Sequence, residues 1–480
     1  MGVGGEARVV KALDHQHQRI VALKIRRVLE PGSREELLRE ARVLLGMAPH
    51  PSLPLVREDF FEDDRYFVVM DWVDGIDLGK LLREQGTPGL PVSSVLAYLA
   101  EAAEALTFLH TYDPPIIHGD VKAANLILTR GGRVKLVDFG LSSRLGAEPR
   151  PGGTSGFRAP ELERGSPPSR ESDVYALAAT ALALLSGAPP SHASGQPSGT
   201  AHDPRLQSAI DAGLSADPLR RPATPGVFVE RLRAGWASTL PTGVVTFCMS
   251  DIEDSTRLWE RDPAAMAEAL VRHDELIAGV VEADGGRFVK SMGEGDSTTS
   301  VFESAGAAAR AVIKATRALA DLTAPDGEPI RVRFGLHTGE ARRHGDVYLG
   351  PAINLAARVR GEASGGEILL SDTTAGLAGA ELPTGYSIVE LGRHRLKGIQ
   401  KPEAIKAIAG PGLPTPRTAG ECPYRGLLSF QPGDRHLFFG REAVVAEVVS
   451  RIAPGRLLAV VGASGSGKSS LLRAGVMAAV

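Results

Sequence analysis

Residues 118–125 read His-Gly-Asp-Val-Lys-Ala-Ala-Asn, and the triplet Asp138-Phe139-Gly140 follows them. Phosphoryl transfer requires a carboxylate that orients the attacking hydroxyl, together with oxygen ligands for Mg²⁺. Asp120 fits the first role, and Asn125 and Asp138 fit the second. Short apolar runs typical of strands flank the motifs, at 116–117, 126–128 and 134–137. The pattern therefore predicts a phosphoryl-transfer site on loops between strands.

The two motifs resemble the catalytic loop and the metal-binding loop of protein kinases. The resemblance covers roughly residues 1–233 and implies a two-lobed kinase fold. It assigns Asp120 as catalytic base with Lys122 beside it, and Asn125 and Asp138 as Mg²⁺ ligands. Lys122, together with Thr154 ahead of the Ala-Pro-Glu at 159–161, indicates Ser/Thr rather than Tyr specificity.

The kinase resemblance also implies an ATP-binding set. Val-Ala-Leu-Lys at 21–24 is similar to the strand whose lysine holds the α and β phosphates, and Glu40 is its natural partner. The stretch 2–9 is similar to a glycine-rich loop, and 70–73 to the hinge that meets adenine. Asp173 and Arg221 match structural positions of the C-terminal lobe. The implied nucleotide-binding residues are Gly2, Gly4, Val9, Lys24, Glu40, Asp71 and Val73.

Two positions depart from the kinase pattern. Gly119 stands where most kinases carry an arginine that a phosphate on the activation loop neutralises. We therefore expect activity that does not depend strictly on loop phosphorylation. Met1 falls within the glycine-rich stretch, so the first strand is expected to be missing or short. The alternative is a pseudokinase that binds partners without chemistry, and the complete set of catalytic residues argues against it.

Composition bounds the class of protein. A chain of 480 residues predicts about three domains. The 54 basic and 57 acidic residues leave no basic field for nucleic acid. Cys248 and Cys422 cannot form a disulfide framework, which favours a reducing, cytoplasmic compartment. No signal peptide is visible, and the longest apolar run, 174–185, is too short for a membrane span and predicts a buried helix.

Segments rich in Pro, Gly and Ser divide the chain. Residues 234–242 and 410–424 are predicted to be linkers. They separate domains at 1–233, 243–409 and 425–480. In the middle domain, apolar runs predict strands at 244–249 and 330–336 and helices at 263–283 and 306–322. That order indicates an α/β sandwich.

Residues 246–256, Thr-Phe-Cys-Met-Ser-Asp-Ile-Glu-Asp-Ser-Thr, place Asp251 at the end of an apolar strand. They resemble the opening of class III adenylyl/guanylyl cyclase domains, which implies a ferredoxin-like α/β fold. In that family two carboxylates hold the metals that activate the ribose 3′-hydroxyl. Asp251 is the first. The second lies in 290–296, where Asp296 is preferred and Glu294 stays open, because two residues are inserted relative to the usual spacing.

The sequence Asn354-Leu-Ala-Ala-Arg358 carries this resemblance furthest, because its two end residues share one helix face. In the family the Asn orients the ribose and the Arg stabilises charge on the transferring phosphate. Lys397 matches the lysine that holds the triphosphate. The metal carboxylates and the Asn–Arg pair come from different subunits in the family, so the resemblance implies a homodimer with two sites.

The base selectivity of the cyclase stays open. Lys290 fits the lysine that marks adenine selectivity, and Asp346 lies one residue from the place expected for its acidic partner. This favours ATP over GTP as substrate, with Mg²⁺ or Mn²⁺ as the metal. Alternatively the domain is a nucleotide-sensing relic.

The last segment carries a Walker A motif, Gly462-Ala-Ser-Gly-Ser-Gly467-Lys468-Ser469. An apolar run at 457–461 predicts the strand before it, and a helix is expected to begin near Ser469. Backbone amides would cradle phosphates, Lys468 would reach the β and γ groups, and Ser469 would take Mg²⁺. With Phe-Phe-Gly-Arg-Glu at 438–442, the segment resembles the start of STAND-type P-loop NTPases, cut off before their remaining strands.

Together these patterns predict an α+β multidomain signalling enzyme of bacterial type. A Ser/Thr kinase would be followed by a cyclase making cAMP or cGMP and by the start of a STAND NTPase. Protein substrates are the expected partners, without nucleic acid or membrane. The alternatives are a nucleotide-binding scaffold and an active cyclase joined to an inactive kinase.

Overall fold

The computed structural model describes residues 8–27, 37, 45–85, 89–138, 143–144, 154, 156–188, 204–289, 296–324, 327–345, 347–416, 429–432, 435, 438–462 and 466–479. The chain divides into two compact units, Met1–Pro416 and Arg417–Val480. The residues named from the sequence that lie outside the described residues include Met1, Gly2, Gly4, Glu40, Phe139, Gly140, Lys290, Glu294, Asp346 and Cys422.

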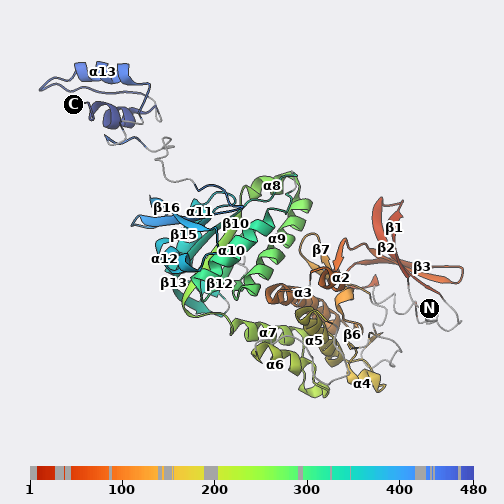
Figure 1. Ribbon diagram of the computed structural model, residues 1–480. Helices are drawn as coiled ribbons and strands as arrows, with labels where there is room; N and C mark the ends of the chain where they lie inside the picture. The colour runs from red at the N-terminus through yellow and green to blue at the C-terminus, as the bar shows by residue number, and fades with distance from the viewer. Residues whose placement is uncertain are drawn as a thin grey trace. The chain divides into compact units, whose positions relative to one another are not determined.

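The N-terminal lobe is an antiparallel sheet in the order β1-β2-β4-β3 (Figure 1). Its strands are β1 (Arg8–Asp14), β2 (Arg19–Arg27), β3 (Val56–Glu62) and β4 (Arg65–Asp71). Aromatic and β-branched residues, which favour strands, fill the buried β4. Lys24 of β2 lies opposite Val68 of β4, so the register of the sheet fixes where this lysine emerges.

Two long helices, α3 (Val92–Thr111) and α5 (Arg170–Ser186), form the core of the next lobe. Helix α5 contains the apolar run predicted to be a buried helix, and every residue from 172 to 185 is buried. Ser169 caps this helix by accepting the amide of Ser172, and Gly187 ends it at φ 77°. The remaining elements of the lobe are β5 (Gly75–Asp77), α2 (Leu78–Gln85), β6 (Ile116–Ile117), η1 (Ala123–Asn125), β7 (Leu126–Thr129), β8 (Val134–Leu136), β9 (Ser143–Arg144), α4 (Pro160–Glu163), α6 (Pro204–Gly213), η3 (Pro218–Arg220) and α7 (Pro225–Ala237).

Helix α3 is the one helix in the described part of the chain that is long and apolar enough to cross a membrane. Half of its apolar window is buried inside the protein. Leu99, Leu106 and Leu109 are fully buried in the core cluster that also contains residues of α5. This burial is the pattern of a core helix in a folded lobe.

Part of the first predicted linker is helical and packs into the core. Residues 234–237 complete α7, and Trp236 and Leu240 are buried in the same core as α3. Tyr348 of the following domain donates its hydroxyl to the carbonyl of Pro241 at 2.6 Å. The connection between the two domains is therefore held by side chains from both.

The next domain is built on one mixed sheet in the order β11-β12-β10-β13-β15-β17-β16, with β14 paired to β13. Strands β13 and β15 are parallel, and the neighbouring pairs are antiparallel. Strands: β10 (Gly243–Ile252), β11 (Arg287–Val289), β12 (Thr298–Phe302), β13 (Val332–His344), β14 (Val347–Leu349), β15 (Ile368–Ser371), β16 (Ser387–His394) and β17 (Glu403–Ala409). Helices: α8 (Ser255–Arg261), α9 (Pro263–Ala283), α10 (Ala305–Leu319), α11 (Pro351–Glu362), α12 (Asp372–Ala378) and η4 (Gly379–Glu381).

Alternation along β10 gives the sheet two packed faces. Cys248 and Ile252 face the core formed with α9 and α10, whereas Phe247 and Met249 belong to the core that includes α11. The predicted strand at 244–249 is confirmed within β10, and the one at 330–336 as the start of β13, which begins two residues later. The predicted helices are confirmed as α9, with the same bounds, and as α10, which begins one residue earlier and ends three residues earlier than predicted.

The second unit contains α13 (Glu442–Ser450), α14 (Lys468–Ser470) and a π-helical turn, Leu471–Val476. The predicted helix near Ser469 is confirmed, but the predicted strand at 457–461 is wrong: these residues form no strand, and Leu457 is 98% exposed. A strand requires a neighbour for its backbone hydrogen bonds. The described residues of this unit supply none.

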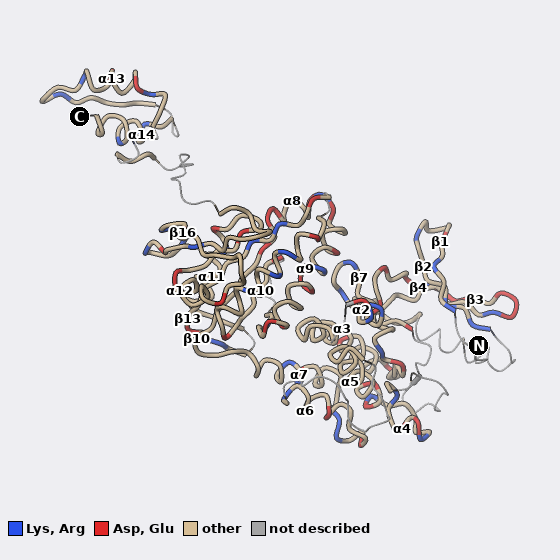
Figure 2. Tube along the Cα trace, viewed as in Figure 1, with Lys and Arg blue, Asp and Glu red and all other residues tan. Residues whose placement is uncertain are grey.

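Charged residues are interspersed along the described chain. Figure 2 shows lysine and arginine alternating with aspartate and glutamate, without a long run of one sign. This agrees with the near balance of 54 basic and 57 acidic residues.

A buried ion pair connects α4 to the segment after η3. Arg221 donates from both terminal nitrogens to Glu161, at 2.6 and 2.7 Å, and both residues are buried. The Glu161→Ala substitution should lower the free energy of unfolding by about 3 kcal/mol, because it leaves a buried guanidinium without its counter-charge. Urea denaturation followed by circular dichroism would measure this loss.

The control is Arg220→Ala, because Arg220 is 82% exposed and pairs with Asp217 at 3.7 Å. Its cost should stay under about 1 kcal/mol. Equal losses in the two variants would contradict a special role for the buried pair.

Candidate functional site

The loop after β6 folds back on itself around Asp120. The 3₁₀ turn η1 brings Asn125 under this aspartate, and Asn125 Nδ2 donates to the Asp120 carbonyl at 2.7 Å and to Oδ2 at 3.1 Å. These bonds fix the carboxylate of Asp120. They also leave Asn125 Oδ1 as an acceptor that a cation can use.

A lysine bridges this loop to the segment before α4. Lys122 Nζ donates to Asp120 Oδ2 at 2.7 Å and to Thr154 Oγ1 at 2.8 Å. The two residues on which Ser/Thr specificity was predicted therefore meet at the predicted base.

The two lobes are joined across the site by Lys24 and Asp138, whose Nζ and Oδ1 atoms are 2.5 Å apart. Burial lowers the pKa of Lys24, and the negative charge of Asp138 opposes that shift. Asp138 has φ 68°, in the left-handed region, and the chain turns there directly after β8 and Val137. The partner predicted for Lys24, Glu40, lies outside the described residues.

Asp173 supports the loop from below. It is fully buried and accepts hydrogen bonds from the amides of His118 and Gly119, each at 2.9 Å, and lies 2.9 Å from His110 Nε2. Burial raises the pKa of Asp173, but the bond with His110 and the neighbouring donors outweigh it, so that the pKa falls below its ordinary value. Gly119 has φ 79°, a conformation that favours glycine.

The residues predicted to meet the nucleotide base lie at the junction of the lobes. Asp71 ends β4, and its carboxylate accepts from Arg57 Nε at 2.7 Å. Val73 is half-buried in the segment between β4 and β5, and Val9 on β1 is 51% exposed. This places Asp71 and Val73 on the connection between lobes and Val9 on the sheet above it.

The described residues fit a divalent cation in this lobe junction. Asn125 and Asp138 offer the oxygen donors that Mg²⁺ prefers. Lys24 would have to share Asp138 with the cation. No described group of three or more His, Cys, Asp and Glu gathers as a metal site, so further ligands would come from phosphate and water.

In the next domain, the strands hold Asp251 between an arginine and a serine, and a second arginine bonds to that serine. Arg333 lies opposite Asp251 in the β10–β13 register and donates to Oδ2 from Nε at 3.1 Å and from Nη2 at 2.5 Å. Ser297 donates to Oδ1 at 3.2 Å and accepts from Arg360 at 2.8 Å. The carboxylate is thus fixed by a cross-strand pair.

Asp296 lies beside this cluster, and its Oδ2 accepts the amide of Ile252 at 3.2 Å. Burial raises the pKa of Asp296; a hydrogen bond from Ser255 opposes that shift, and the negative charge of Asp251 adds to it. Two neighbouring carboxylates repel each other unless a cation lies between them. The donor set of Asp251 and Asp296 therefore fits a divalent metal, and the alternative second ligand, Glu294, lies outside the described residues.

The structure does not bring Asn354 and Arg358 to these aspartates. Both are exposed on α11, and their side chains make no hydrogen bond or ion pair with the described residues. Helix α11 is anchored through Ala352, Ala356 and Val359 on its other face. Lys397, in the turn after β16, is also exposed.

In the second unit, Lys468 Nζ donates to the carbonyl of Gly462 at 2.7 Å. Gly467 has φ 82°, and Ser469 is exposed at the start of the helical turn. Residues 463–465 lie outside the described residues. The structure thus brings together the ends of the Walker A loop.

Three site residues were missed from the sequence: Arg333, Ser297 and Arg360. Arg333 could have been found by its alternation on the predicted strand, but only if the pairing of that strand with β10 were known. Ser297 adjoins Asp296, which was singled out. Arg360 carries no signal beyond its position two residues after Arg358.

The Arg333→Gln substitution should lower the free energy of unfolding by about 2 kcal/mol, because it removes charged hydrogen bonds to the partly buried Asp251. Arg331→Gln is the matched control, since Arg331 is exposed just before β13. Urea denaturation of both variants would measure the difference. A shift as large in the control would show that the loss comes from net charge.

Comparison with known proteins assigns each part. Residues 1–218 match the protein kinase domain model, 238–407 the adenylate and guanylate cyclase catalytic domain model, and 423–480 the Novel STAND NTPase 1 model.

Relatives were found in mycobacteria. Uncharacterized protein Rv0891c of Mycobacterium tuberculosis is 36% identical over 228 residues, which cover 47% of this chain and 74% of that protein. Serine/threonine-protein kinase PknF of the same species is 35% identical over 203 residues, which cover 40% of this chain and 42% of PknF.

Among solved structures, the Mycobacterium tuberculosis PknI kinase domain is 29% identical, with a TM-score of 0.41, and covers 49% of this chain and 92% of that one. The family models and the lobes described above agree. The chain therefore belongs to the proteins that join a protein kinase domain, an adenylate/guanylate cyclase catalytic domain and a STAND NTPase segment.

Proposed function

We propose that the first domain transfers the γ-phosphoryl group of ATP to Ser or Thr hydroxyls and that the second cyclises a nucleoside triphosphate. The observation that carries the proposal is the convergence of Asp120, Lys122, Asn125 and Thr154 beside the Lys24–Asp138 pair. A non-catalytic scaffold has no need for a carboxylate fixed in this way.

In the kinase reaction, Asp120 would orient the attacking hydroxyl and accept its proton. Asn125 and Lys122 hold the carboxylate so that it does not rotate away from the substrate. Lys122 would then stabilise charge on the transferring phosphoryl group. Bound Mg²⁺, held by Asn125 and Asp138, would neutralise the triphosphate.

Thr154 supports the proposed preference for Ser and Thr. Its hydroxyl lies 3.4 Å from Asp120 Oδ1 and is bonded to Lys122, so a threonine hydroxyl lies beside the proposed base. Gly119 supports a second element of the proposal. Because no arginine side chain stands at that position, the loop would not require an activating phosphate to neutralise it.

In the cyclase reaction, Asp251 and Asp296 would hold Mg²⁺ or Mn²⁺, which lowers the pKa of the ribose 3′-hydroxyl when bound. Asn354, Arg358 and Lys397 would act on the nucleotide held by a second copy of the chain. Their exposure, and their separation from Asp251, support a homodimer. We propose ATP as the preferred substrate of the cyclase domain, with GTP as the alternative.

We propose domain boundaries at 1–233, 243–409 and 425–480 and a cytoplasmic location. Gly462, Gly467, Lys468 and Ser469 would bind a nucleotide phosphate in the last domain. The exposure of Gly462, Gly467 and Ser469 supports this role.

Two variants of the full chain separate the two activities. Asp120→Asn should reduce phosphorylation with labelled ATP by about 10²–10⁴-fold, because the amide cannot accept a proton. Cyclic nucleotide formation, assayed with Mn²⁺ and either ATP or GTP, should persist in that variant. Asp251→Asn should give the reverse result.

If neither activity is found in the parent chain, the proposal fails. If Asp120→Asn keeps full kinase activity, the assignment of the base fails while the cyclase assignment stands.

Mixed variants test the shared cyclase site. Asp251→Ala and Asn354→Ala should each be inactive alone, because each dimer then lacks one half of both sites. After subunit exchange, half of the dimers carry one intact site, so about a quarter of the parent activity should return. Mixing Asp251→Ala with Asp296→Ala is the control, since both changes fall in the same half. Recovery in that control, or none in the first mixture, would contradict a site shared between subunits.

A further inference from the structure

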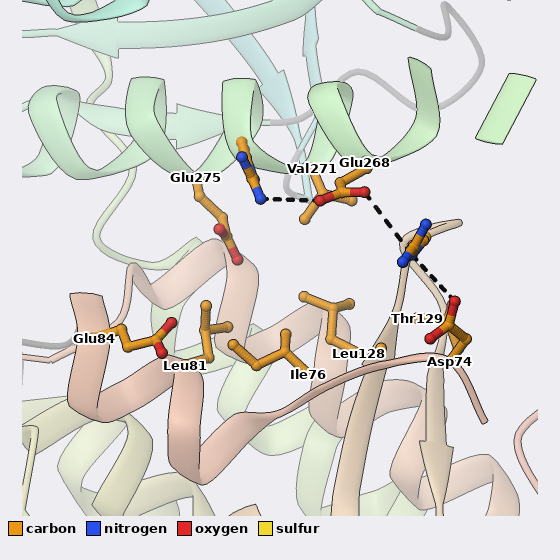
Figure 3. A pocket seen from close by; sticks show the side chains of 12 residues that line it. Asp74, Ile76, Leu81, Glu84, Leu128, Thr129, Glu268, Val271 and Glu275 are labelled. Atoms are coloured by element: carbon orange, nitrogen blue, oxygen red, sulfur yellow. Dashed lines mark hydrogen bonds and ion pairs between the residues drawn. The ribbon is translucent and has the colours of Figure 1, made fainter. Parts of the chain in front are cut away.

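Helix α9 of the cyclase domain is packed on two sides. One side enters the cyclase core through Met266, Ala269, His273, Ile277, Ala278 and Val281. The other side carries Glu268, Val271, Glu275 and Glu282, which recur at helical spacing and contact the kinase domain. Figure 3 shows three of them, Glu268, Val271 and Glu275, facing kinase residues. Acidic residues are common on the outer face of a helix, so the evidence for docking lies in the contacts that these side chains make.

The middle of this stripe makes a buried polar contact and an apolar one. Tyr98 of α3, which is 7% exposed, donates its hydroxyl to Glu275 at 2.7 Å. Val271 packs against the core cluster that contains residues of α3 and of the cyclase sheet, and it comes close to Gly132, where an added Cβ would lie 3.3 Å from its methyl group. Burial of Glu275 raises its pKa, opposed by the bond from Tyr98. The kinase domain therefore shields Glu275 of the cyclase domain from water.

At one edge of the contact lies a pocket of about 300 Å³ lined by both domains. Glu268 is held by Arg272 at 2.9 Å and lies 3.9 Å from Arg130, which also pairs with Asp74 (Figure 3). Asp74 is the residue next to Val73 in the connection between the kinase lobes. The interface therefore reaches the segment that positions the nucleotide base.

The end of the stripe meets the first turn of α3. A helix begins with backbone amides that have no partner inside the helix. The N-cap of α3 is Pro91, whose side chain offers no acceptor, and among the described kinase residues none is seen to cap this end with its side chain. Glu282 fills that role from the cyclase domain, because its Oε2 accepts the amide of Val92 at 3.1 Å. Its negative charge also suits the positive end of the helix dipole.

Glu282 is buried in surroundings that disfavour its charged form. Burial raises the pKa of Glu282 to about 7, while the amides of Val92 and Ser93 and the charge of Arg287 oppose the shift. Its second oxygen is buried without a hydrogen-bond partner. A solvent-exposed acid would not be desolvated in this way, so the contact with α3 holds the side chain there.

We propose that the kinase surface formed by the start of α3, Tyr98 and Arg130 is a docking site for α9 of the same chain, and that Glu282 is the cap of α3. The occupant is seen in place, and it meets the surface through the bonds of Glu282 with Val92 and of Tyr98 with Glu275 and through the ion pair of Glu268 with Arg130. As a consequence, the first turn of a kinase core helix depends on the cyclase domain being folded and docked. The two domains would then open together, not independently.

Hydrogen exchange of the full chain, followed in peptides from the start of α3, tests this proposal. Glu282→Ala should speed exchange there on the order of fivefold, the value of a lost N-cap. Glu282→Gln should stay within about twofold of the parent, because its amide oxygen can still accept the bond. Glu367→Ala is the matched control, since Glu367 accepts the amide of Ser364 at 2.8 Å entirely within the cyclase. It should leave α3 unchanged.

A second pair of variants keeps the test decisive if Glu282→Ala does not fold. Tyr98→Phe removes the hydroxyl that reaches Glu275, and it should speed exchange in both α3 and α9. Tyr386→Phe removes a hydroxyl that donates to Pro411 at 2.8 Å, away from the kinase surface, and should change neither helix. The proposal is overturned if Glu282→Ala and Tyr98→Phe leave exchange unchanged, or if the controls speed it equally.

Discussion

The structure depends on one electrostatic constraint: each carboxylate that we propose to act at a metal-dependent site needs a basic or polar partner within the protein. Lys24 meets this need for Asp138, Lys122 for Asp120 and Arg333 for Asp251. Lys24 and Arg333 reach their acids from distant parts of the chain, so folding of the sheets assembles these two pairs, whereas Lys122 and Asp120 meet within one loop. A partly buried carboxylate without such a partner would shift toward its neutral form and lose its use as a ligand.

The two proposed sites differ in which of their residues lie together within this chain. In the kinase lobes, the base, its lysine and the metal-directed aspartate lie on adjoining loops of one core. In the cyclase, the sheet gathers Asp251 and Asp296, but α11 turns Asn354 and Arg358 outward to solvent. The anchoring face of α11 is apolar, so the helix cannot rotate these residues inward without exposing its core side.

Sequence reasoning succeeded where the periodicity is strong, as for α9 and β10. The short motifs led to residues that the structure brings near one another, such as Asp120 with Asn125 and Asp251 with Asp296, and their catalytic and metal-binding roles stay predictions. It failed for 457–461, where an apolar run has no neighbouring strand among the described residues and stays irregular. It also missed Arg333, because a cross-strand pair depends on register, and register is set by the whole sheet.

The contact between α9 and α3 lay beyond the sequence for a related reason. The polar residues on the second side of α9 look like an ordinary solvated helix face, because Glu268, Arg272 and Glu275 are hydrophilic. Their role becomes visible only with α3, because that helix begins at a proline whose side chain cannot cap it. Neither segment alone reveals the match, and only their apposition turns an uncapped helix end and an acidic stripe into an interface. The sequence periodicity of either segment does not reveal such a contact. Contacts of this kind are best sought at helix ends whose own neighbours supply no hydrogen-bond acceptor.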